Sequence, residues 1–585
     1  MPATPLIARC IPLTRALLAS ALLLLVACER APIDLPKPAA TAPKPAADDG
    51  ARRIEADVRF LADDLLEGRE AGTRGYALAS LYVAERFRAM GLQPAGEDGG
   101  YFQEVPMLQA TRLEDGARFA VERDGKTTEL RFREQFLPNA SFNAEAFSIE
   151  APAVFVGQGV HAPELEHDDF AGLDLEGRIA VLFPGAPARF DNDQRAFHSS
   201  MREKLRAIAE RGAIGVVVAH TASDEARSPW ARASAGWNKP GMRLRGAGGK
   251  GIDTFPELQG SASVSAAAAD ALFAGSGRTA AQLFDAAKAG TLKGFDLPGS
   301  LAIAGRTRIE ALESRNVVGR LPGGDGALGR EHVVYTAHLD HVGIGAPVDG
   351  DAIYNGALDN ALGVAVMLEA ARILGNERQP PKRSALFVAL TAEEKGLLGA
   401  EWFATHPTVP RGSLVANLNM DMPVLLAPSS DVVPIGIEHS SLQPLVEQAA
   451  KDVGVALSPD PFPEEVVFVR SDQYAFIRAG IPAVYLDGGV VAVRPAGAGS
   501  GSKAATTPDA KTDPKLAMRG FLRHCYHQPC DDASQPIRYA DAARLARLNA
   551  RIGVLVGNVA ERPAWKPGDF FGERFGRPAA EAPAE

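Results

Sequence analysis

Three short apolar runs between residues 333 and 422 constrain the fold more than any other feature of this sequence. They read VVYTA, ALFVAL and LVANLNM, and patterns typical of helices separate them. Short apolar runs that alternate with helices indicate buried parallel strands. The sequence therefore predicts an α/β fold with a mostly parallel sheet.

Each apolar run ends in side chains that can bind a metal. His338 and Asp340 end the first run, Glu393 and Glu394 follow the second, and Asp421 ends the third. In an α/β sheet, ligands gather at the carboxyl ends of the strands. One histidine and four acids crowded there would repel one another, and bound cations would supply the opposing charge. The pattern therefore predicts a metal site at this edge of the sheet.

Two further residues can complete such a site. Asp359 lies ahead of a helical pattern, and His527 lies in the polar segment 524–532. One histidine and one terminal carboxylate for each metal, with a shared bridging carboxylate, form a chemically sensible two-zinc site. Taken alone, an aspartate before a helix is usually an N-cap, and two acids at a helix start are ordinary partners of the helix dipole.

Six motifs in this order resemble the M28 family of co-catalytic zinc peptidases. They are AHLDH (337–341), GALDNALG (356–363), TAEEKGLLGA (391–400), NLNMDM (417–422), SDQYAFIRAGIP (471–482) and CYHQPCDD (525–532). The resemblance extends over roughly residues 51–560. It implies a three-layer zinc-peptidase domain with a mostly parallel central mixed sheet. It also implies hydrolysis of peptide bonds, with release of amino-terminal residues as the expected activity.

The resemblance assigns the ligands of two Zn²⁺ ions. His338 and Asp421 match the ligands of the first ion, and Glu394 and His527 match those of the second. Asp359 matches the carboxylate that bridges both ions, and the family pattern implies a cis peptide bond after it. His524 is an alternative ligand if the register of its loop differs.

The resemblance also implies three catalytic residues. Glu393 matches the general base, which takes a proton from the attacking water and passes it to the leaving amine. Asp340 is expected to hold the imidazole of His338 by its other N–H group. Tyr526 matches a tyrosine that stabilises the oxyanion in some relatives, with a packing role as the alternative.

Some neighbouring residues receive no catalytic role. His341 is expected to be structural, and Gly68 and Arg69 are expected to form a structural turn, with a functional role as the alternative. Gln473 stands where the family often has a histidine, so we assign it no role in catalysis.

The segment 135–300 interrupts the peptidase pattern. Its GRIAVLF and GAIGVVVAH stretches resemble the protease-associated (PA) domain that several M28 enzymes carry as an insertion. The resemblance implies a β-rich domain that shapes or covers the cleft, and a passive β-rich insert is the alternative. The peptidase domain would then comprise residues 51–134 and 301–560, followed by a disordered tail at 561–585.

The first 50 residues indicate export. Arg9 and Arg15 precede an apolar run at 16–27, as in a signal peptide. The run ends in LVAC, which resembles a bacterial lipobox, so a lipid on Cys28 would anchor the chain to a membrane facing the periplasm or cell surface. A plain secretory signal is the alternative. Residues 28–50 read as a linker rich in Pro and Ala.

Cysteine content agrees with export. Besides Cys28, only Cys525 and Cys530 remain after the signal, and they flank His527. A disulfide between them would stiffen this loop, and two free thiols are the alternative.

Length and charge restrict the remaining function classes. A chain of 585 residues exceeds one ordinary core and indicates two or more domains. A net charge of -10 argues against a nucleic-acid partner. The alternatives to an aminopeptidase are a glutamate-carboxypeptidase-like exopeptidase, a glutaminyl cyclase with one zinc and a non-catalytic binding lipoprotein. Retention of the full set of ligands argues against the last two.

Overall fold

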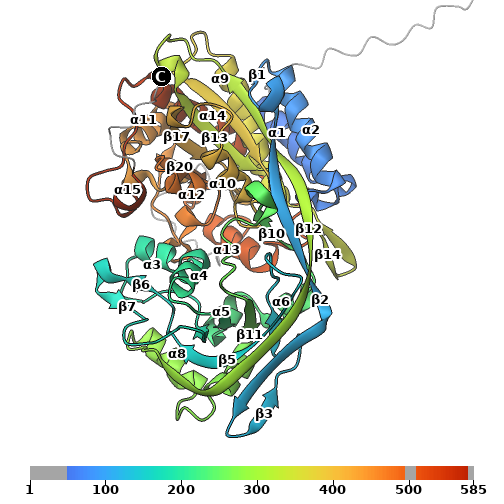
Figure 1. Ribbon diagram of the computed structural model, residues 1–585. Coiled ribbons are helices and arrows are strands. Elements are labelled where there is room, and N and C mark those ends of the chain that lie inside the picture. Colours follow the sequence, from blue (N-terminus) through green and yellow to red (C-terminus); the bar gives the residue numbers. More distant parts are fainter. Residues whose placement is uncertain (1–48, 494–508, 577–585) are drawn as a thin grey trace, which may run out of the picture. The chain divides into compact units, whose positions relative to one another are not determined.

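A computed structural model describes residues 49–493 and 509–576 (Figure 1). The predicted signal peptide, Cys28 and nearly all of the predicted linker lie outside the described residues. The first helix, α1 (Asp49–Leu61), begins just before the predicted end of that linker. Within the described ranges, no helix combines the length and apolar character needed to cross a membrane.

One large mixed sheet contains most of the strands. Its main path, in spatial order, consists of β19 (Ala456–Leu457), β18 (Asp431–Ile435), β20 (Ala483–Asp487), β17 (Leu414–Asn419), β13 (His332–His338), β16 (Ser384–Leu390), β12 (Phe295–Leu321), β5 (Ala146–Phe155), β8 (Ile179–Leu182), β9 (Gly215–Ala219), β11 (Gly260–Val264) and β4 (Phe136–Pro138). Strands β1 (Gln93–Pro94), β2 (Phe102–Arg123), β3 (Lys126–Glu129) and β10 (Gly241–Leu244) pair off this path.

The catalytic half of the sheet has the predicted parallel core. Strands β20, β17, β13 and β16 are neighbours and run parallel, whereas β12 and β18 join this group antiparallel. The three predicted apolar runs are β13, β16 and β17. The prediction of an α/β fold with a mixed, mostly parallel central sheet is therefore confirmed.

Alternate side chains of the central strands face two different cores. Val333, Tyr335 and Ala337 of β13 pack in the core that helices α1, α2 (Arg74–Ala89), α9 (Leu362–Gly375), α11 (Gln443–Val453) and α14 (Tyr539–Asn558) help to form. Val334 packs in the opposite core with residues of α10 (Leu398–Thr405) and α12 (Gln473–Arg478). Since both faces of each strand are covered, apolar residues occur without alternation, as in buried parallel strands. The predicted three layers are present.

The insert and the catalytic half share strand β12. Its first part pairs with β5, where Phe295 lies opposite Phe155, and its last part pairs with β16, where Val317 lies opposite Ala389. Figure 1 shows β12 and β2 running side by side along this path. The insert has its own core, which includes residues of β5, β8, β9 and β11. The boundaries at 134/135 and 300/301 and the PA identity remain predictions.

The insert also carries several short helices. They are α3 (Asn192–His198), α4 (Met201–Ala209), α5 (Ala222–Arg227), α6 (Trp230–Ala235), α7 (Ala269–Phe273) and α8 (Ala280–Lys288). Parallel pairing continues from β5 through β8 and β9 to β11. This part is therefore an α/β layer rather than a purely β-rich one.

The predicted disordered tail at 561–585 is wrong for residues 561–576. Helix α15 (Phe570–Phe575) packs there, and Phe571 is fully buried. His439 Nδ1 lies 2.6 Å from Asp569 Oδ2, and the rings of His439 and Phe468 contact Phe571. The Pro-rich composition indicated disorder, but these aromatic contacts and one ion pair hold the segment. Residues 577–585 lie outside the described part of the chain.

Candidate active site

The predicted site residues meet at one edge of the sheet. His338 is the last residue of β13, Glu393 and Glu394 lie in the turn after β16, and Asp421 follows β17. Asp359 lies immediately before α9, and the peptide bond between it and Asn360 is cis. Parallel strands end at the same edge, so the fold brings together residues that are far apart in sequence.

The first ligand cluster is formed by His338, Asp359 and Asp421. Nε2 of His338 lies 3.0 Å from Asp421 Oδ1 and 3.3 Å from Asp359 Oδ1. The donor atoms of the three residues lie within 4.8 Å of one another. His338 is buried, and only the side chain of Asp421 retains some exposure. This geometry places three ligand atoms around one point.

The second ligand cluster contains Asp359, Glu394 and His527. Nε2 of His527 lies 3.1 Å from Asp359 Oδ2 and 3.0 Å from Glu394 Oε2. Oδ1 of Asp359 therefore faces His338, and Oδ2 faces His527. A carboxylate whose two oxygens face different imidazoles has the orientation that a bridging ligand requires.

His341 also lies at the second cluster, although we expected only a structural role for it. Its side chain is fully buried, and Nδ1 lies 2.8 Å from Glu394 Oε1 and 3.9 Å from Asp359 Oδ2. The close contact does not have the geometry of a hydrogen bond. Among the described residues, neither nitrogen of His341 nor Oε1 of Glu394 has a hydrogen-bond partner. The spacing of two histidines in His-Leu-Asp-His is the sequence signal that could have indicated this second imidazole.

The structure corrects the predicted contact of Asp340. Nδ1 of His338 lies 3.1 Å from the backbone carbonyl oxygen of Asp340 and 3.9 Å from its carboxylate. The carboxylate instead accepts hydrogen bonds from the backbone N–H groups of Glu393 at 3.1 Å and Glu394 at 3.3 Å. Asp340 is completely buried. Its side chain therefore positions the turn that carries the two glutamates, and its backbone positions the histidine.

Burial and charge shift the titration of the site residues. Burial raises the pKa of the Glu393 carboxyl well above its ordinary value, and the charges of Glu394 and Asp421 add to this effect. Burial acts to raise the pKa of Asp359, but hydrogen bonds from His338 and His527 outweigh it and hold that pKa well below the usual range. Within one crevice, the pKa of Glu393 is therefore raised and that of Asp359 is lowered.

The residues at this edge fit divalent cations of the zinc class. Imidazole nitrogens and carboxylate oxygens are the ligands that zinc prefers besides thiolates. Glu394 Oε1 is buried without a hydrogen bond among the described residues, and Asp472, which is completely buried, has two such oxygens. Buried carboxylates of this kind require a cation or a proton. The donor set and its surplus of acids thus match the predicted metal chemistry.

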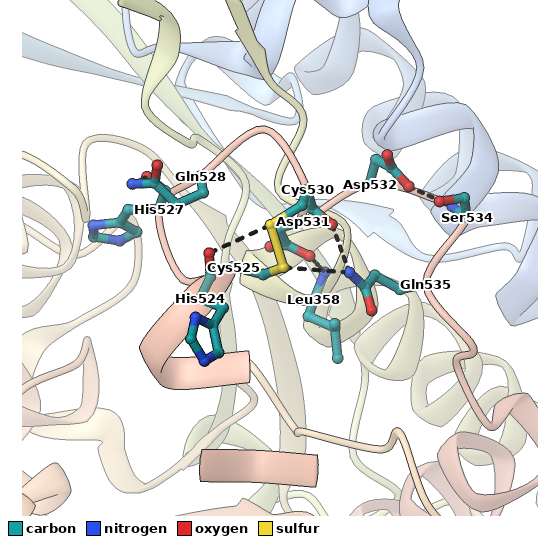
Figure 2. The surroundings of a disulfide bond; sticks show 10 residues. All are labelled: Leu358, His524, Cys525, His527, Gln528, Cys530, Asp531, Asp532, Ser534 and Gln535. Carbon is teal, nitrogen blue, oxygen red and sulfur yellow. Dashed lines mark hydrogen bonds between the residues drawn. A yellow bond between two sulfur atoms is a disulfide. The ribbon is translucent and has the colours of Figure 1, made fainter. Parts of the chain in front are cut away.

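The loop of His527 is closed by a disulfide between Cys525 and Cys530 (Figure 2). The structure therefore favours the disulfide over two free thiols. His524 is exposed at the end of helix α13 (Pro514–His524), and Figure 2 shows its ring directed away from that of His527. The alternative assignment of His524 as the ligand is wrong, because His527 is the residue that reaches Asp359 and Glu394.

Tyr526 contacts a proposed ligand, whereas Gln473 bonds to a residue outside the ligand set. The Tyr526 ring stacks on the His527 ring, with 3.8 Å between the ring centroids, and it also packs against the main core. Its predicted oxyanion role remains a prediction. Gln473 is buried and accepts a hydrogen bond from Asn419 Nδ2 at 2.7 Å. This contact gives Gln473 a structural role.

Arg69 holds backbone segments beside the site, and the sequence alone did not predict these contacts. Its fully buried guanidinium donates to the backbone carbonyls of Leu339, Asn355, Gly356 and Leu61. Burial lowers the pKa of Arg69 to about 10, and nearby acids, Asp531 foremost, oppose this shift. Arg69 therefore joins the segment after β13 to the turn before Asp359, so its role exceeds that of a local turn.

Comparison with known proteins agrees with this site. Residues 316–552 match the model of Peptidase family M28, so the chain contains a Peptidase family M28 domain. A "Probable zinc metalloprotease" of Pyrenophora tritici-repentis (strain Pt-1C-BFP) is 42% identical over 76 residues, which cover 13% of this chain and 17% of that protein. "Aminopeptidase YwaD" of Bacillus subtilis (strain 168) is 38% identical over 88 residues, covering 14% and 18%.

The regions shared with these two curated relatives are short. The chain spans less than one fifth of the length of these two curated relatives. Among solved structures, "Aminopeptidase from Aneurinibacillus sp. strain AM-1" is 18% identical, with 86% of this chain and 92% of that chain covered and a TM-score of 0.49.

Proposed function

We propose that this protein is a co-catalytic two-zinc exopeptidase that releases amino-terminal residues from peptides. The observation that carries the proposal is the orientation of Asp359, whose two oxygens face His338 and His527 at 3.3 and 3.1 Å. Asp421 and Glu394 then provide one terminal carboxylate for each ion. The names of the two curated relatives, a probable zinc metalloprotease and an aminopeptidase, support this proposal.

We assign proton transfer, positioning and oxyanion stabilisation to different residues of the site. When bound, zinc would supply Lewis acidity to the scissile carbonyl and to a water molecule. Glu393 would take a proton from the attacking water and deliver it to the leaving amine, a role that its raised pKa suits. Asp340 would hold Glu393 in place through the hydrogen bond to its backbone N–H group. Tyr526, next to the proposed ligand His527, would donate a hydrogen bond from its hydroxyl group to the developing oxyanion.

A panel of peptide substrates tests the proposed activity. We expect the purified protein to hydrolyse peptides with a free amino terminus and to leave amino-blocked peptides intact. A chelator should abolish the activity, and added zinc should restore it. Activity that persists after the chelator has removed all metal would contradict the proposal. If the protein binds two zinc ions but cleaves no peptide, the next assay is cyclisation, the reaction of a glutaminyl cyclase. A negative result in that assay would favour the binding lipoprotein.

A carboxypeptidase is the second candidate, and one cavity favours it. The cavity has a volume of about 290 Å³, and its lining includes Arg195 of α3 in the insert and Arg470 of the catalytic half. No ion pair of Arg195 is found among the described residues, whereas Arg470 lies 3.1 Å from Glu465 Oε2. Guanidinium groups suit a carboxylate, which is the group that such an enzyme must recognise.

Arg195 provides the test between the two candidates. If the cavity binds the carboxyl terminus of a substrate, Arg195→Gln should raise the KM for free-acid peptides and leave the KM for amidated peptides unchanged. If the KM of each kind of peptide is the same in the variant and the wild type, the aminopeptidase is favoured.

The proposal includes a location. We propose that the chain is exported and lipid-anchored through Cys28, because Cys28 ends the lipobox-like LVAC segment. Cys28→Ser should move the protein from the membrane fraction to the soluble fraction. Unchanged membrane partition of this variant would argue for another mode of attachment.

A further inference from the structure

Asp531 binds the backbone of the segment that carries the bridging carboxylate. The side chain of Asp531 is completely buried. Its Oδ1 accepts a hydrogen bond from the N–H group of Leu358 at 2.8 Å, and its Oδ2 accepts one from the N–H group of Asp359 at 3.0 Å. Its backbone oxygen accepts a third hydrogen bond from Ala357 at 3.0 Å. Figure 2 shows Asp531 directed at Leu358 from the disulfide loop.

The same loop carries a metal ligand. The disulfide between Cys525 and Cys530 closes the loop around His527, and Asp531 directly follows Cys530. The N–H group of Asp531 donates to the carbonyl of Gln528 at 3.0 Å, which ties the residue to this loop. The loop therefore presents His527 to the second cluster and holds the backbone of another ligand, Asp359, at the same time.

We propose that Asp531 is a positioning residue of the metal centre, which sets the bridging carboxylate of Asp359 relative to the imidazole of His527. The inference rests on the proposed two-zinc site and goes beyond it, because Asp531 itself offers no atom to either ligand cluster. The two clusters place Asp359 Oδ2 and His527 Nε2 only 3.1 Å apart, although the residues come from distant segments of the chain. Among the described residues, the polar contacts that join these two segments beside the site are those of Asp531 and of the ligands themselves.

A carboxylate suits this position better than other acceptors. Two consecutive N–H groups point at the side chain, and each requires its own acceptor because both are buried. Asparagine has one acceptor oxygen, so its amide N–H₂ group would face a backbone N–H group. The substitution Asp531→Asn therefore removes one hydrogen bond and adds a donor–donor contact with almost no change in side-chain volume.

The test compares Asp531→Asn with Asp532→Asn in the full-length protein. Asp532 is adjacent, and its Oδ1 accepts a hydrogen bond at 2.6 Å from the N–H group of Ser534, a residue of its own loop. Zinc stoichiometry is measured by mass spectrometry and zinc affinity by competition with a chromophoric chelator. Thermal unfolding of the metal-free proteins serves as an independent measure of the fold.

We expect Asp531→Asn to weaken binding of zinc by about 10- to 100-fold, the usual effect of removing a group that orients a ligand. Asp532→Asn should bind zinc like the wild type. Zinc affinity of Asp531→Asn within threefold of the wild type would overturn the inference. A loss of thermal stability without any change in zinc affinity would also overturn it, because a purely structural role predicts that result.

A second variant covers the case in which Asp531→Asn does not fold. Asp531→Glu keeps both acceptor oxygens and displaces them by one methylene group. Weaker zinc binding by this folded variant supports the inference, and wild-type affinity contradicts it. If the wild type binds zinc but cleaves no peptide, the proposed function fails while the role of Asp531 stands. If the wild type binds no zinc, both fail.

Discussion

The adjacent residues Glu393 and Glu394 allow the proposed roles to be separated with two equivalent substitutions. Both backbone N–H groups donate to the carboxylate of Asp340, at 3.1 and 3.3 Å. Only Glu394 contacts a proposed histidine ligand, with its Oε2 3.0 Å from His527 Nε2. Replacement of either residue by glutamine keeps the side-chain size and the backbone contact, and it removes one carboxylate.

We expect Glu393→Gln to retain zinc and lose turnover. The charge that it removes lies near Glu394 and Asp421, so its removal relieves repulsion within the crevice. Loss of a general base costs about 10²- to 10⁴-fold in kcat, which corresponds to about 3–5 kcal/mol of transition-state stabilisation. Glu394→Gln should lower zinc content and activity together, because it removes the terminal carboxylate of the second cluster.

The assay measures zinc per chain by mass spectrometry and kcat on a peptide with a free amino terminus. A kcat of Glu393→Gln within threefold of the wild type, at full zinc content, would refute its role as the general base. Equal loss of zinc in the two variants would refute the distinction between base and ligand.

Four further results are expected from other parts of the structure. Asp340→Asn should lower kcat more than tenfold while the protein still binds zinc through His338, as activity and zinc titration would show. Arg69→Met should lower the free energy of unfolding by at least about 4 kcal/mol in urea, since it leaves four buried carbonyls without donors at about 1–3 kcal/mol each. Replacement of both Cys525 and Cys530 by serine should weaken zinc binding measured by chelator competition, and unchanged affinity would exclude a role of the disulfide in holding the site. Burial lowers the pKa of His332 to about 4, so its contribution to stability is complete above pH 6.5 and is lost as the pH falls towards 4. Urea unfolding of metal-free His332→Gln should therefore depend less on pH than the wild type in this window, by up to about 3 kcal/mol.

The central sheet and the meeting of most of the proposed ligands could be predicted because their sequence signals are local. Each of the strands β13, β16 and β17 is an apolar run that ends in acids or histidine, and a parallel sheet brings such ends together. The rule explains why His338, Glu394 and Asp421 should meet, and the family resemblance supplied their assignment as ligands. Their distances in the structure agree with it.

Residues that act through the backbone of distant segments could not be predicted in the same way. Asp531 accepts hydrogen bonds from Leu358 and Asp359, and Arg69 donates to the carbonyls of Leu339 and Gly356. Apart from proline, every residue has the same backbone N–H and C=O groups, so the sequence does not identify these partners. These contacts become visible only when the fold is known.

Asp340 lies at the predicted place, but the contact predicted for its carboxylate is wrong. The sequence placed its carboxylate on the imidazole of His338, but that contact is made by the backbone oxygen at 3.1 Å. The carboxylate lies under the turn that carries Glu393 and Glu394 and accepts both N–H groups. Asparagine at this position would keep the backbone oxygen, so the orientation of His338 should persist and the first cluster should still bind zinc. The loss should instead fall on the general base and on the second cluster, and a selective loss at the first cluster would show that the carboxylate acts on His338 after all.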